Sequence, residues 1–330
     1  MVVGKTIVTG ATGGLGQVLT AILLAQGRDV IATGRDATKG AALAQAGAQF
    51  VRADLVYDDL APLVAASDCV FHLAALSSPW GDRADFVAAN FTATQRLLGA
   101  ARAAGCRKFI FASTPSVYTT SREQLKLSEA SALPPRLVND YAVTKLQAEQ
   151  AVLAASAGDF YTVALRPRAI ISPHDTVLLP RLVQAAERGV LPLPGFGRAL
   201  IEPTDARDVA AAMIAAEAQS EEANGTIFNI SGGEPVRLKE LVRHVFQKLG
   251  KKVRLVPVPA RLVLGLGGLA EFVAARRPGK PEPSLTRYSA MALGWSQTFD
   301  LTRARTILGW EPRYSPVQAL NWALEERGIA

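Results

Sequence analysis

Short apolar runs alternate with helix-forming stretches through the first half of the chain. The runs are KTIVTG, DVIATG, QFVRAD, CVFHLA, KFIFAS and FYTVALRP, and Ala and Leu at helical spacing fill the segments 15–26, 82–104 and 139–157. Continuous apolar strands separated by helices are typical of a parallel sheet that is covered on both faces. The pattern predicts a doubly wound α/β fold, whose ligand lies beyond the carboxyl ends of the strands.

The pattern changes after about residue 170. The segments SPHD, LPLPGFG, SGGEPVR and RRPGKPEP are rich in turn formers, and the helices between them are shorter. We expect residues 1–170 to form a dinucleotide-binding domain with the catalytic residues, and residues 171–330 to form a smaller substrate-binding lobe. The apolar run at 225–231, GTIFNIS, predicts that this lobe returns to the sheet at least once.

A glycine-rich turn follows the first predicted strand. Gly10, Gly13 and Gly16 open the first predicted helix in TIVTGATGGLGQVL. Glycines at this spacing permit a tight turn, a close approach of the backbone to a pyrophosphate and close packing of the helix on the strand. The free N–H groups of the helix N-terminus then face the phosphates. In this context the motif indicates a Rossmann-type dinucleotide site rather than a purely structural turn.

The end of the second strand indicates which dinucleotide binds. An NAD site carries an acidic residue there for the ribose 2′-hydroxyl, but this strand ends in Gly34 and is followed by Arg35, with Lys39 one turn later. A guanidinium without a carboxylate suits a 2′-phosphate, which favours NADP(H) over NAD(H). Asp36 would reach the ribose if the turn were displaced by one residue, so NAD remains the alternative. Asp54, after the third strand, is a candidate for the adenine amino group or for a helix N-cap.

The stretch VNDYAVTKLQAEQAVL places a phenol and an ammonium one helical turn apart. Tyr141 and Lys145 are four residues apart and share one face of the predicted helix. A neighbouring ammonium favours the phenolate and brings the pKa of the phenol closer to neutrality, as general acid–base catalysis requires. Tyr141 would then donate a proton to a carbonyl oxygen as a hydride reaches the carbon, and Lys145 would hydrogen-bond the nicotinamide ribose.

Hydroxyl groups at the end of the fifth strand are candidates for holding the substrate oxygen. Ser113, Thr114 and Ser116 lie there in FIFASTPSVY. Their hydroxyls can donate to a carbonyl that becomes an alkoxide. Capping of the strand end is the alternative role for each of them.

Several motifs together carry a family resemblance. In their order along the chain, TGATGGLG, HLAA, ASTPSVY, YAVTK, LRPRAI and DLTRARTILGWEP are similar to the landmarks of the extended short-chain dehydrogenase/reductases, over nearly the whole length. The resemblance implies Thr114 as the catalytic hydroxyl, Tyr141 as the acid–base, Lys145 as its partner and Asn90 as a structural or relay residue. It also implies a homodimer. The expected cofactor contacts are Gly10, Thr12, Gly13, Gly14, Leu15, Gly16, Arg35, Asp54, Leu55, Leu73, Ala74, Ala75, Tyr141, Lys145, Pro167 and Ile170.

Within that family, STPSV and the region of SSPWGD are more similar to the 3β-hydroxysteroid dehydrogenase-like branch, which includes bacterial 2-alkyl-3-oxoalkanoate reductases, than to sugar-nucleotide enzymes. Sugar-nucleotide epimerases are expected to carry an Asn after VALRP and an Arg before IEPTDARDVA, where this chain has RPRAIISP and Ile201. Both changes remove diphosphate-binding groups. A sugar-nucleotide epimerase or dehydratase with bound NAD, the alternative function, would need Arg168 or Arg198 in their place.

The resemblance implies a hydrophobic substrate, steroid-like or 3-oxoacyl-like, whose ketone and secondary alcohol are interconverted. The candidates for contacting it are Ser77, Trp80, Thr114 and Arg168. The apolar segment 260–275 would line a pocket for such a substrate or contact a membrane surface, unless it is a buried helix with glycines for close packing. His72 is interpreted as a structural residue near the cofactor, and His174 as a loop residue.

Composition excludes several classes of protein. The 330 residues are 49% hydrophobic and 20% charged, as in a globular protein that buries a full core. The net charge of +7 is concentrated from Arg237 onward, with 16 Lys+Arg against 7 Asp+Glu. Aromatic residues do not interleave with these basic residues, so nucleic acid is not an expected partner. Cys69 and Cys106 have no metal-ligand spacing around them, and no metal is expected.

The sequence shows no targeting or membrane-spanning pattern, and we expect a cytoplasmic protein. A non-catalytic NAD(P)-sensing regulator would keep the glycine turn but has no need of Thr114, Tyr141 and Lys145 together. Their joint presence favours an enzyme, an NAD(P)-dependent dehydrogenase/reductase acting on CH–OH groups.

Overall fold

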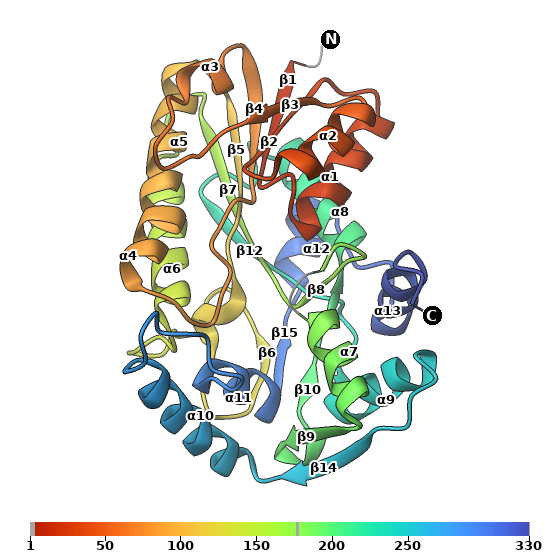
Figure 1. Ribbon diagram of the computed structural model, residues 1–330. Coiled ribbons are helices and arrows are strands. Elements are labelled where there is room, and N and C mark those ends of the chain that lie inside the picture. The colour runs from red at the N-terminus through yellow and green to blue at the C-terminus, as the bar shows by residue number, and fades with distance from the viewer. Residues whose placement is uncertain (1–3, 176–177, 330) are drawn as a thin grey trace.

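The computed structural model describes residues 4–175 and 178–329. Its centre is a parallel sheet of seven strands in the order β12-β7-β5-β4-β1-β2-β3 (Figure 1). The strands are β1 (Lys5–Thr9), β2 (Val30–Gly34), β3 (Gln49–Arg52), β4 (Ser67–His72), β5 (Lys108–Ala112), β7 (Tyr161–Pro167) and β12 (Thr226–Ile230). All six predicted apolar runs form strands of this sheet, and β12 confirms the predicted return of the chain.

Helices cover both faces of the sheet because successive strand residues point to opposite sides. In β1, Ile7 joins one hydrophobic core and Val8 the other, and both are fully buried. The core around Val8 is completed by α1 (Gly14–Ala25), α2 (Ala37–Gln45), α8 (Ala206–Ala218) and α12 (Thr302–Leu308). The core around Ile7 is completed by α3 (Ala61–Val64), α5 (Ala93–Ala103) and α6 (Asp140–Ala154). The predicted Rossmann-type doubly wound fold is confirmed.

The predicted helix at 82–104 is not a regular α-helix throughout. It begins as α4 (Arg83–Phe86), continues as the π-helical segment η1 (Val87–Thr92) and ends as α5. Buried Asn90 lies in the π-helical segment. Such segments are rare and frequently accompany functional sites.

The chain after residue 171 interleaves with the sheet, because it supplies β12, α8 and α12. Its other elements surround a third core between α7 (Leu178–Arg188), α9 (Leu238–Lys248) and α13 (Pro316–Glu325). Four two-stranded sheets join β6 (Gln124–Leu127) to β15 (Gln297–Phe299), β8 (Ile170–Ile171) to β11 (Thr204–Asp205), β9 (Val190–Pro194) to β14 (Arg254–Val258), and β10 (Leu200–Ile201) to β13 (Val236–Arg237). The domain boundary at 170 remains a prediction.

The apolar segment at 260–275 forms α10 (Ala260–Ala274), which packs on α11 (Arg287–Gly294) at the outer edge of the molecule (Figure 1). One face is buried through Val263, Gly267 and Ala274. The other face exposes large apolar side chains, so a fully buried helix is the wrong interpretation; they are Leu262 (54%), Leu266 (49%), Leu269 (60%), Phe272 (55%) and Val273 (40%). No helix of the described ranges is long and apolar enough to span a bilayer.

Candidate active site

The glycine turn between β1 and α1 has no room for side chains. Gly10 has a φ of +65°, and a Cβ there would lie 2.7 Å from the backbone nitrogen of Ala74. A Cβ on Gly16 would lie 2.2 Å from the carbonyl oxygen of Gly10. Gly13, the N-cap of α1, offers no side chain to cap the helix. The free N–H groups in the first turn of α1 therefore fit the pyrophosphate of a dinucleotide.

A buried hydrogen-bond chain fixes the end of β4, beside this turn. The Thr9 hydroxyl accepts from the amides of residues 73 and 74, at 3.2 Å each, and lies 2.7 Å from His72 Nδ1. His72 Nε2 lies 2.9 Å from the hydroxyl of Thr94, which itself donates to the Asn90 carbonyl. This arrangement requires a neutral imidazole with its proton on Nε2. Burial, aided by the charge of Lys145, lowers the pKa of His72 to about 3.

Asn90 joins the loop after β4 to the catalytic helix α6. Its Oδ1 accepts from the Leu76 amide at 2.7 Å, and its Nδ2 donates to the Leu76 carbonyl and to the Thr144 hydroxyl, at 3.2 Å each. Leu76 immediately precedes Ser77, and Thr144 lies on α6 three residues after Tyr141. Asn90 thus positions Ser77 relative to Tyr141.

Hydroxyl groups from four parts of the chain meet at the carboxyl edge of the sheet. Tyr141 is half-buried, and its phenol hydrogen-bonds the side chains of Thr114 and Ser77. Thr114 Oγ1 donates to Ser116 Oγ at 3.0 Å, and Ser116 Oγ lies 3.0 Å from the Tyr288 hydroxyl. Sequence reasoning missed Tyr288, which lies 172 residues from Ser116 in the chain and belongs to no recognised motif.

The neighbouring serine has a different role. Ser113 is buried, and its hydroxyl donates to Glu149 Oε2 at 2.6 Å, on the sheet side of α6. Thr114 also caps the 3-10 helix η2 (Pro115–Tyr118), by accepting from the Ser116 amide. Of the candidate hydroxyls, Thr114 is the one that faces Tyr141.

Lys145 contacts the main chain and a ring of β5 in this structure. Its Nζ donates to the Ala112 carbonyl at 2.6 Å and lies 4.0 Å from the centre of the Phe111 ring. Burial lowers the pKa of Lys145 to about 7, although the charge of Glu149 acts in the opposite direction. Burial also raises the pKa of Tyr141, against the hydrogen bonds from Thr114 and Ser77. Desolvation thus dominates both groups in this structure, and the role of Lys145 as the partner of Tyr141 remains a prediction.

The tip of β2 carries the residues expected at the adenosine end. Arg35 projects with a side-chain exposure of 77% and lies 4.0 Å from Asp54 Oδ2. Asp36 caps α2 by accepting from the Lys39 amide at 3.1 Å. A Cβ on Gly34 would lie 2.7 Å from Thr12 Oγ1, so this tip has little room for an acidic side chain.

The remaining predicted residues divide between the cofactor edge and the lobe contact. Leu73, Ala74 and Ala75 continue β4, Leu55 is buried after β3, and Pro167 and Ile170 lie at the end of β7 and in β8. Trp80 instead contacts the lobe, since its Nε1 donates to the Lys280 carbonyl at 2.9 Å. Arg168 is buried against α11, where its Nη2 faces the Ala292 carbonyl. His174 lies in a loop, and its own carbonyl oxygen would lie 3.4 Å from a Cβ on Gly14.

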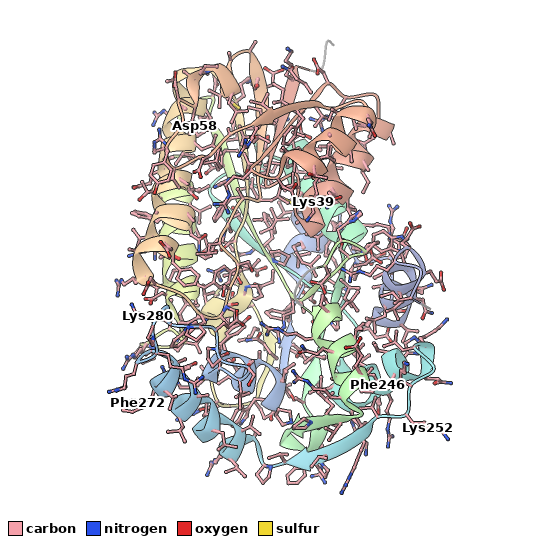
Figure 2. The ribbon with its side chains drawn as sticks, viewed as in Figure 1. Lys39, Asp58, Phe246, Lys252, Phe272 and Lys280 are labelled. Carbon is pink, nitrogen blue, oxygen red and sulfur yellow. The ribbon has the colours of Figure 1, made fainter. Side chains whose placement is uncertain are left out.

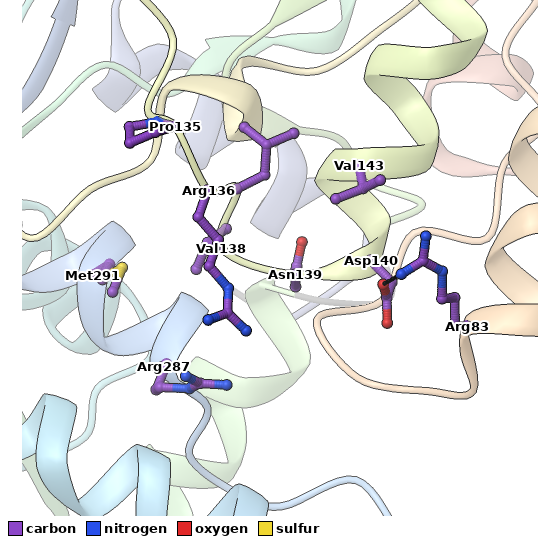
Figure 3. A pocket seen from close by; sticks show the side chains of 10 residues that line it. Arg83, Pro135, Arg136, Val138, Asn139, Asp140, Val143, Arg287 and Met291 are labelled. Atoms are coloured by element: carbon purple, nitrogen blue, oxygen red, sulfur yellow. Dashed lines mark ion pairs between the residues drawn. The ribbon is translucent and has the colours of Figure 1, made fainter.

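A pocket of about 660 Å³ lies between the start of α6 and α11 (Figure 3). Such a volume is typical of small-molecule sites. Apolar side chains share its lining with three arginines and Asp140, the neighbour of Tyr141; the lining comprises Arg83, Pro135, Arg136, Leu137, Val138, Asn139, Asp140, Val143, Arg287 and Met291. Sequence reasoning missed this pocket, because the loop 133–139 shows only a turn-rich composition.

Comparisons with known proteins agree with this geometry. The NAD dependent epimerase/dehydratase family matches residues 6–231. The chain is 33% identical over 324 residues to the 2-alkyl-3-oxoalkanoate reductase of Stenotrophomonas maltophilia, covering 96% of this chain and 97% of that protein. It is 32% identical over 328 residues, or 99% and 97% of the two chains, to the 4-hydroxy-2-methyl-3-oxo-4-farnesyl-3,4-dihydroquinoline-1-oxide ketoreductase of Stigmatella aurantiaca.

A solved structure with a similar fold is MoeE5 in complex with UDP-glucose and NAD. It has a TM-score of 0.78 and 26% identity, covering 99% of this chain and all of that one. The glycine turn, the sheet order and these similarities confirm the resemblance found in the motifs. The chain belongs to the NAD dependent epimerase/dehydratase family, within the extended short-chain dehydrogenase/reductases and their 3β-hydroxysteroid dehydrogenase-like branch, and is an NAD(P)-dependent dehydrogenase/reductase.

Proposed function

We propose that this enzyme uses NADP(H) to interconvert a ketone and a secondary alcohol on a hydrophobic substrate. The observation that carries the proposal is the hydrogen-bonded group formed by Tyr141, Thr114 and Ser77, next to the glycine turn at the carboxyl edge of the sheet. This group presents hydroxyls to a carbonyl oxygen, and no nucleophile–base pair is needed for such a reaction.

In the proposed mechanism, Tyr141 is the proton donor for ketone reduction. Because burial raises the pKa of Tyr141, the phenol holds its proton at neutral pH. A bound nicotinamide supplies the hydride. Thr114 holds the oxygen that becomes an alkoxide, and Ser77 orients the phenol from the other side. Lys145, whose pKa is about 7, can exchange protons near neutral pH behind Tyr141.

The geometry at the tip of β2 favours the 2′-phosphate of NADP. Asp36 is engaged as the α2 N-cap and lies 3.9 Å from the Lys39 ammonium, which leaves its carboxylate little freedom to accept from a ribose hydroxyl. Arg35 is free to turn toward a phosphate, since it is exposed and its contact with Asp54 is long. NAD remains the alternative, as it is the cofactor bound in MoeE5.

The pocket and the named relatives support a hydrophobic ketone as substrate. Pro135, Val138, Val143 and Met291 provide an apolar lining beside the start of the catalytic helix. Two of the similar proteins are named as reductases of an oxoalkanoate and of an oxo-quinoline oxide. A sugar-nucleotide epimerase is less well supported, because Ile201 is buried in the core of the lobe where such enzymes would present an arginine.

Cofactor titration followed by a ketone panel tests this proposal. We expect NADPH to bind more tightly than NADH, measured by the fluorescence of the reduced nicotinamide, and to be oxidised by bulky apolar ketones. Tyr141→Phe should abolish this oxidation and leave the binding of NADPH intact. Protein that retains NAD through purification and shows no net turnover would instead support the epimerase.

We also propose that the exposed face of α10 contacts an anionic membrane surface. Leu262, Leu266, Leu269 and Val273 form one exposed stripe at helical spacing, and contiguous exposed apolar patches commonly mark protein or membrane contacts. Exposed Arg261, Arg276, Arg277 and Lys280 flank the stripe, and Figure 2 shows Phe272 and Lys280 at the outer edge of the lobe. An apolar stripe with basic flanks matches an anionic lipid surface.

Vesicle co-sedimentation tests the membrane contact. Wild type should bind vesicles that contain phosphatidylglycerol but not those of phosphatidylcholine alone, and the double variant Leu266→Glu, Leu269→Glu should lose binding. Tyr57→Glu removes an even more exposed apolar side chain from a distant loop and serves as the control. If wild type binds neither kind of vesicle, and the double variant instead converts a dimer into monomers, a second copy of the chain covers α10.

A homodimer and a cytoplasmic location remain predictions.

A further inference from the structure

Arg168 is a buried cation without an ion-pair partner. Only 6% of the residue is exposed, and no carboxylate of the described residues lies within 4.0 Å of its guanidinium. Its Nε has no hydrogen-bond acceptor, and its Nη2 reaches the Ala292 carbonyl only at 3.5 Å. A buried guanidinium in this state carries a large desolvation cost that nothing close to it offsets.

The carboxylate whose charge acts on Arg168 already accepts hydrogen bonds from other groups. Glu202 is buried, and its Oε2 accepts from the Ser231 hydroxyl at 2.5 Å and from the Phe299 amide at 3.3 Å. Burial raises the pKa of Glu202, although its hydrogen bonds with Ser231 and Phe299 act in the opposite direction. Glu202 attracts Arg168 from beyond ion-pair distance, and burial still lowers the pKa of Arg168. The guanidinium therefore lacks a close anion of its own.

Arg168 lies next to the candidate catalytic hydroxyls. Ala292 and Tyr288 are four residues apart on α11, so they share one face of that helix. Tyr288 interacts electrostatically with both Arg168 and Tyr141, and its hydroxyl is linked through Ser116 to Thr114. Tyr288 thus interacts both with the unpaired guanidinium and with the candidate catalytic hydroxyls.

We propose that Arg168, assisted by the Tyr288 hydroxyl, binds a carboxylate of the substrate, so that the preferred substrate is an oxo acid whose ketone lies at Tyr141 and Thr114. The planar guanidinium suits two parallel hydrogen bonds to a carboxylate. The proposal rests on the proposed ketone reduction and adds a charged group to its hydrophobic substrate. Arg168 acts here in recognition, and Tyr141 retains the proton transfer.

Kinetics with a matched substrate pair test the role of the charge. With 3-oxodecanoate and its methyl ester, wild type should favour the acid, and Arg168→Met should lower kcat/KM for the acid about 10- to 100-fold, mainly through KM, with little change for the ester. Arg168→Lys should recover part of the loss. Arg188→Met removes an exposed arginine of the same lobe and should change the kinetics with neither substrate. Equal loss on acid and ester would overturn the proposal.

A binding measurement without turnover separates this proposal from the reductase function. Decanoate, which has no ketone, should raise the Tm of wild type, and decanol should not. Arg168→Met should lose the response to decanoate, yet melt no lower than wild type in buffer, because it removes an unpaired buried charge. If decanoate stabilises both proteins equally, or if the variant alone melts far lower, Arg168 has a structural role and the proposal fails. Retained decanoate binding without any ketone reduction would leave the anion site standing and refute the reductase.

Discussion

Two arginines at the end of β7, Arg166 and Arg168, are two residues apart and equally buried, but their surroundings differ. Arg166 donates to both carboxylate oxygens of Glu149 and to the Tyr118 hydroxyl, and it packs over the Tyr118 ring at 4.9 Å. Burial lowers its pKa, but the bonds and charge of Glu149 outweigh burial and raise the pKa overall. Arg168 has no comparable partner and a lowered pKa. A paired buried charge indicates a structural role, whereas an unpaired one beside a cleft indicates a ligand.

The comparison extends to the side chains around each arginine. On the side of Arg166, which we call the closed network, Ser113 donates to Glu149, and Tyr118 accepts from Arg166. On the side of Arg168, which we call the cleft side, lie Tyr288 and the proposed catalytic hydroxyls of Thr114 and Tyr141. We therefore expect substitutions in the closed network to change stability, and substitutions on the cleft side to change turnover.

The largest expected effect is on turnover at the cleft side. Tyr141→Phe removes the proposed proton donor and should lower kcat for ketone reduction about 10²- to 10⁴-fold, measured by NADPH absorbance. Its Tm should stay within a few degrees of wild type. If the Tm instead falls strongly while the folded fraction keeps its activity, Tyr141 has a structural role. The expected difference between the two sides of the site is then wrong.

The next effect concerns the closed network. Arg166→Met leaves the Glu149 carboxylate buried without its cation, and the free energy of unfolding should fall by about 3–5 kcal/mol in urea denaturation. The double variant Arg166→Met, Glu149→Leu should recover much of this loss, because no uncompensated charge remains. If Arg168→Met destabilises the protein as much as Arg166→Met does, the distinction between the two arginines is wrong.

The pH dependence of stability adds a test of the comparison through Lys145, which is buried and is attracted by the charge of Glu149. Its pKa is about 7 in the folded protein and about 10.4 when unfolded, so between these values the unfolded chain binds the extra proton. The free energy of unfolding should therefore rise with pH from about 7 to 10, with a slope of up to about 1.4 kcal/mol per pH unit from this group. Urea denaturation at several pH values measures the slope.

Lys145→Met is the matched variant for that experiment. It should lose this part of the pH dependence, because the group that releases the proton is absent. An unchanged slope in Lys145→Met would show that the ammonium is not desolvated in the folded protein.

The smallest effect is expected from Ser113→Ala. It removes one hydrogen bond to the Glu149 carboxylate and should lower the free energy of unfolding by about 1–3 kcal/mol, with kcat nearly unchanged. Thr114→Ala, the neighbouring substitution, should show the reverse pattern. Steady-state kinetics and urea denaturation of both variants distinguish the two patterns. A kcat for Ser113→Ala as low as that for Thr114→Ala would contradict the structural role of Ser113.

Local patterns predicted much of the sheet and of the cofactor edge. The apolar runs became strands, and the glycine turn adopted the one conformation that its close contacts permit. The spacing of Tyr141 and Lys145 placed both on α6, but it gave no information about the direction of the ammonium. Packing against Phe111 and the Ala112 carbonyl set that direction, and desolvation then set both pKa values.

By itself, the sequence determined the fold class and the glycine turn, and it placed Tyr141 and Lys145 on one helix, because strand periodicity, turn chemistry and helical spacing act between near neighbours in the chain. The choice of Thr114 among three neighbouring hydroxyls came from the family resemblance. Only the tertiary structure decided that Arg166 is paired and Arg168 is not, and that Tyr288 joins Ser116 across 172 residues. Charges and hydroxyls acquire their partners from whichever distant elements pack against them, and no local pattern encodes that packing.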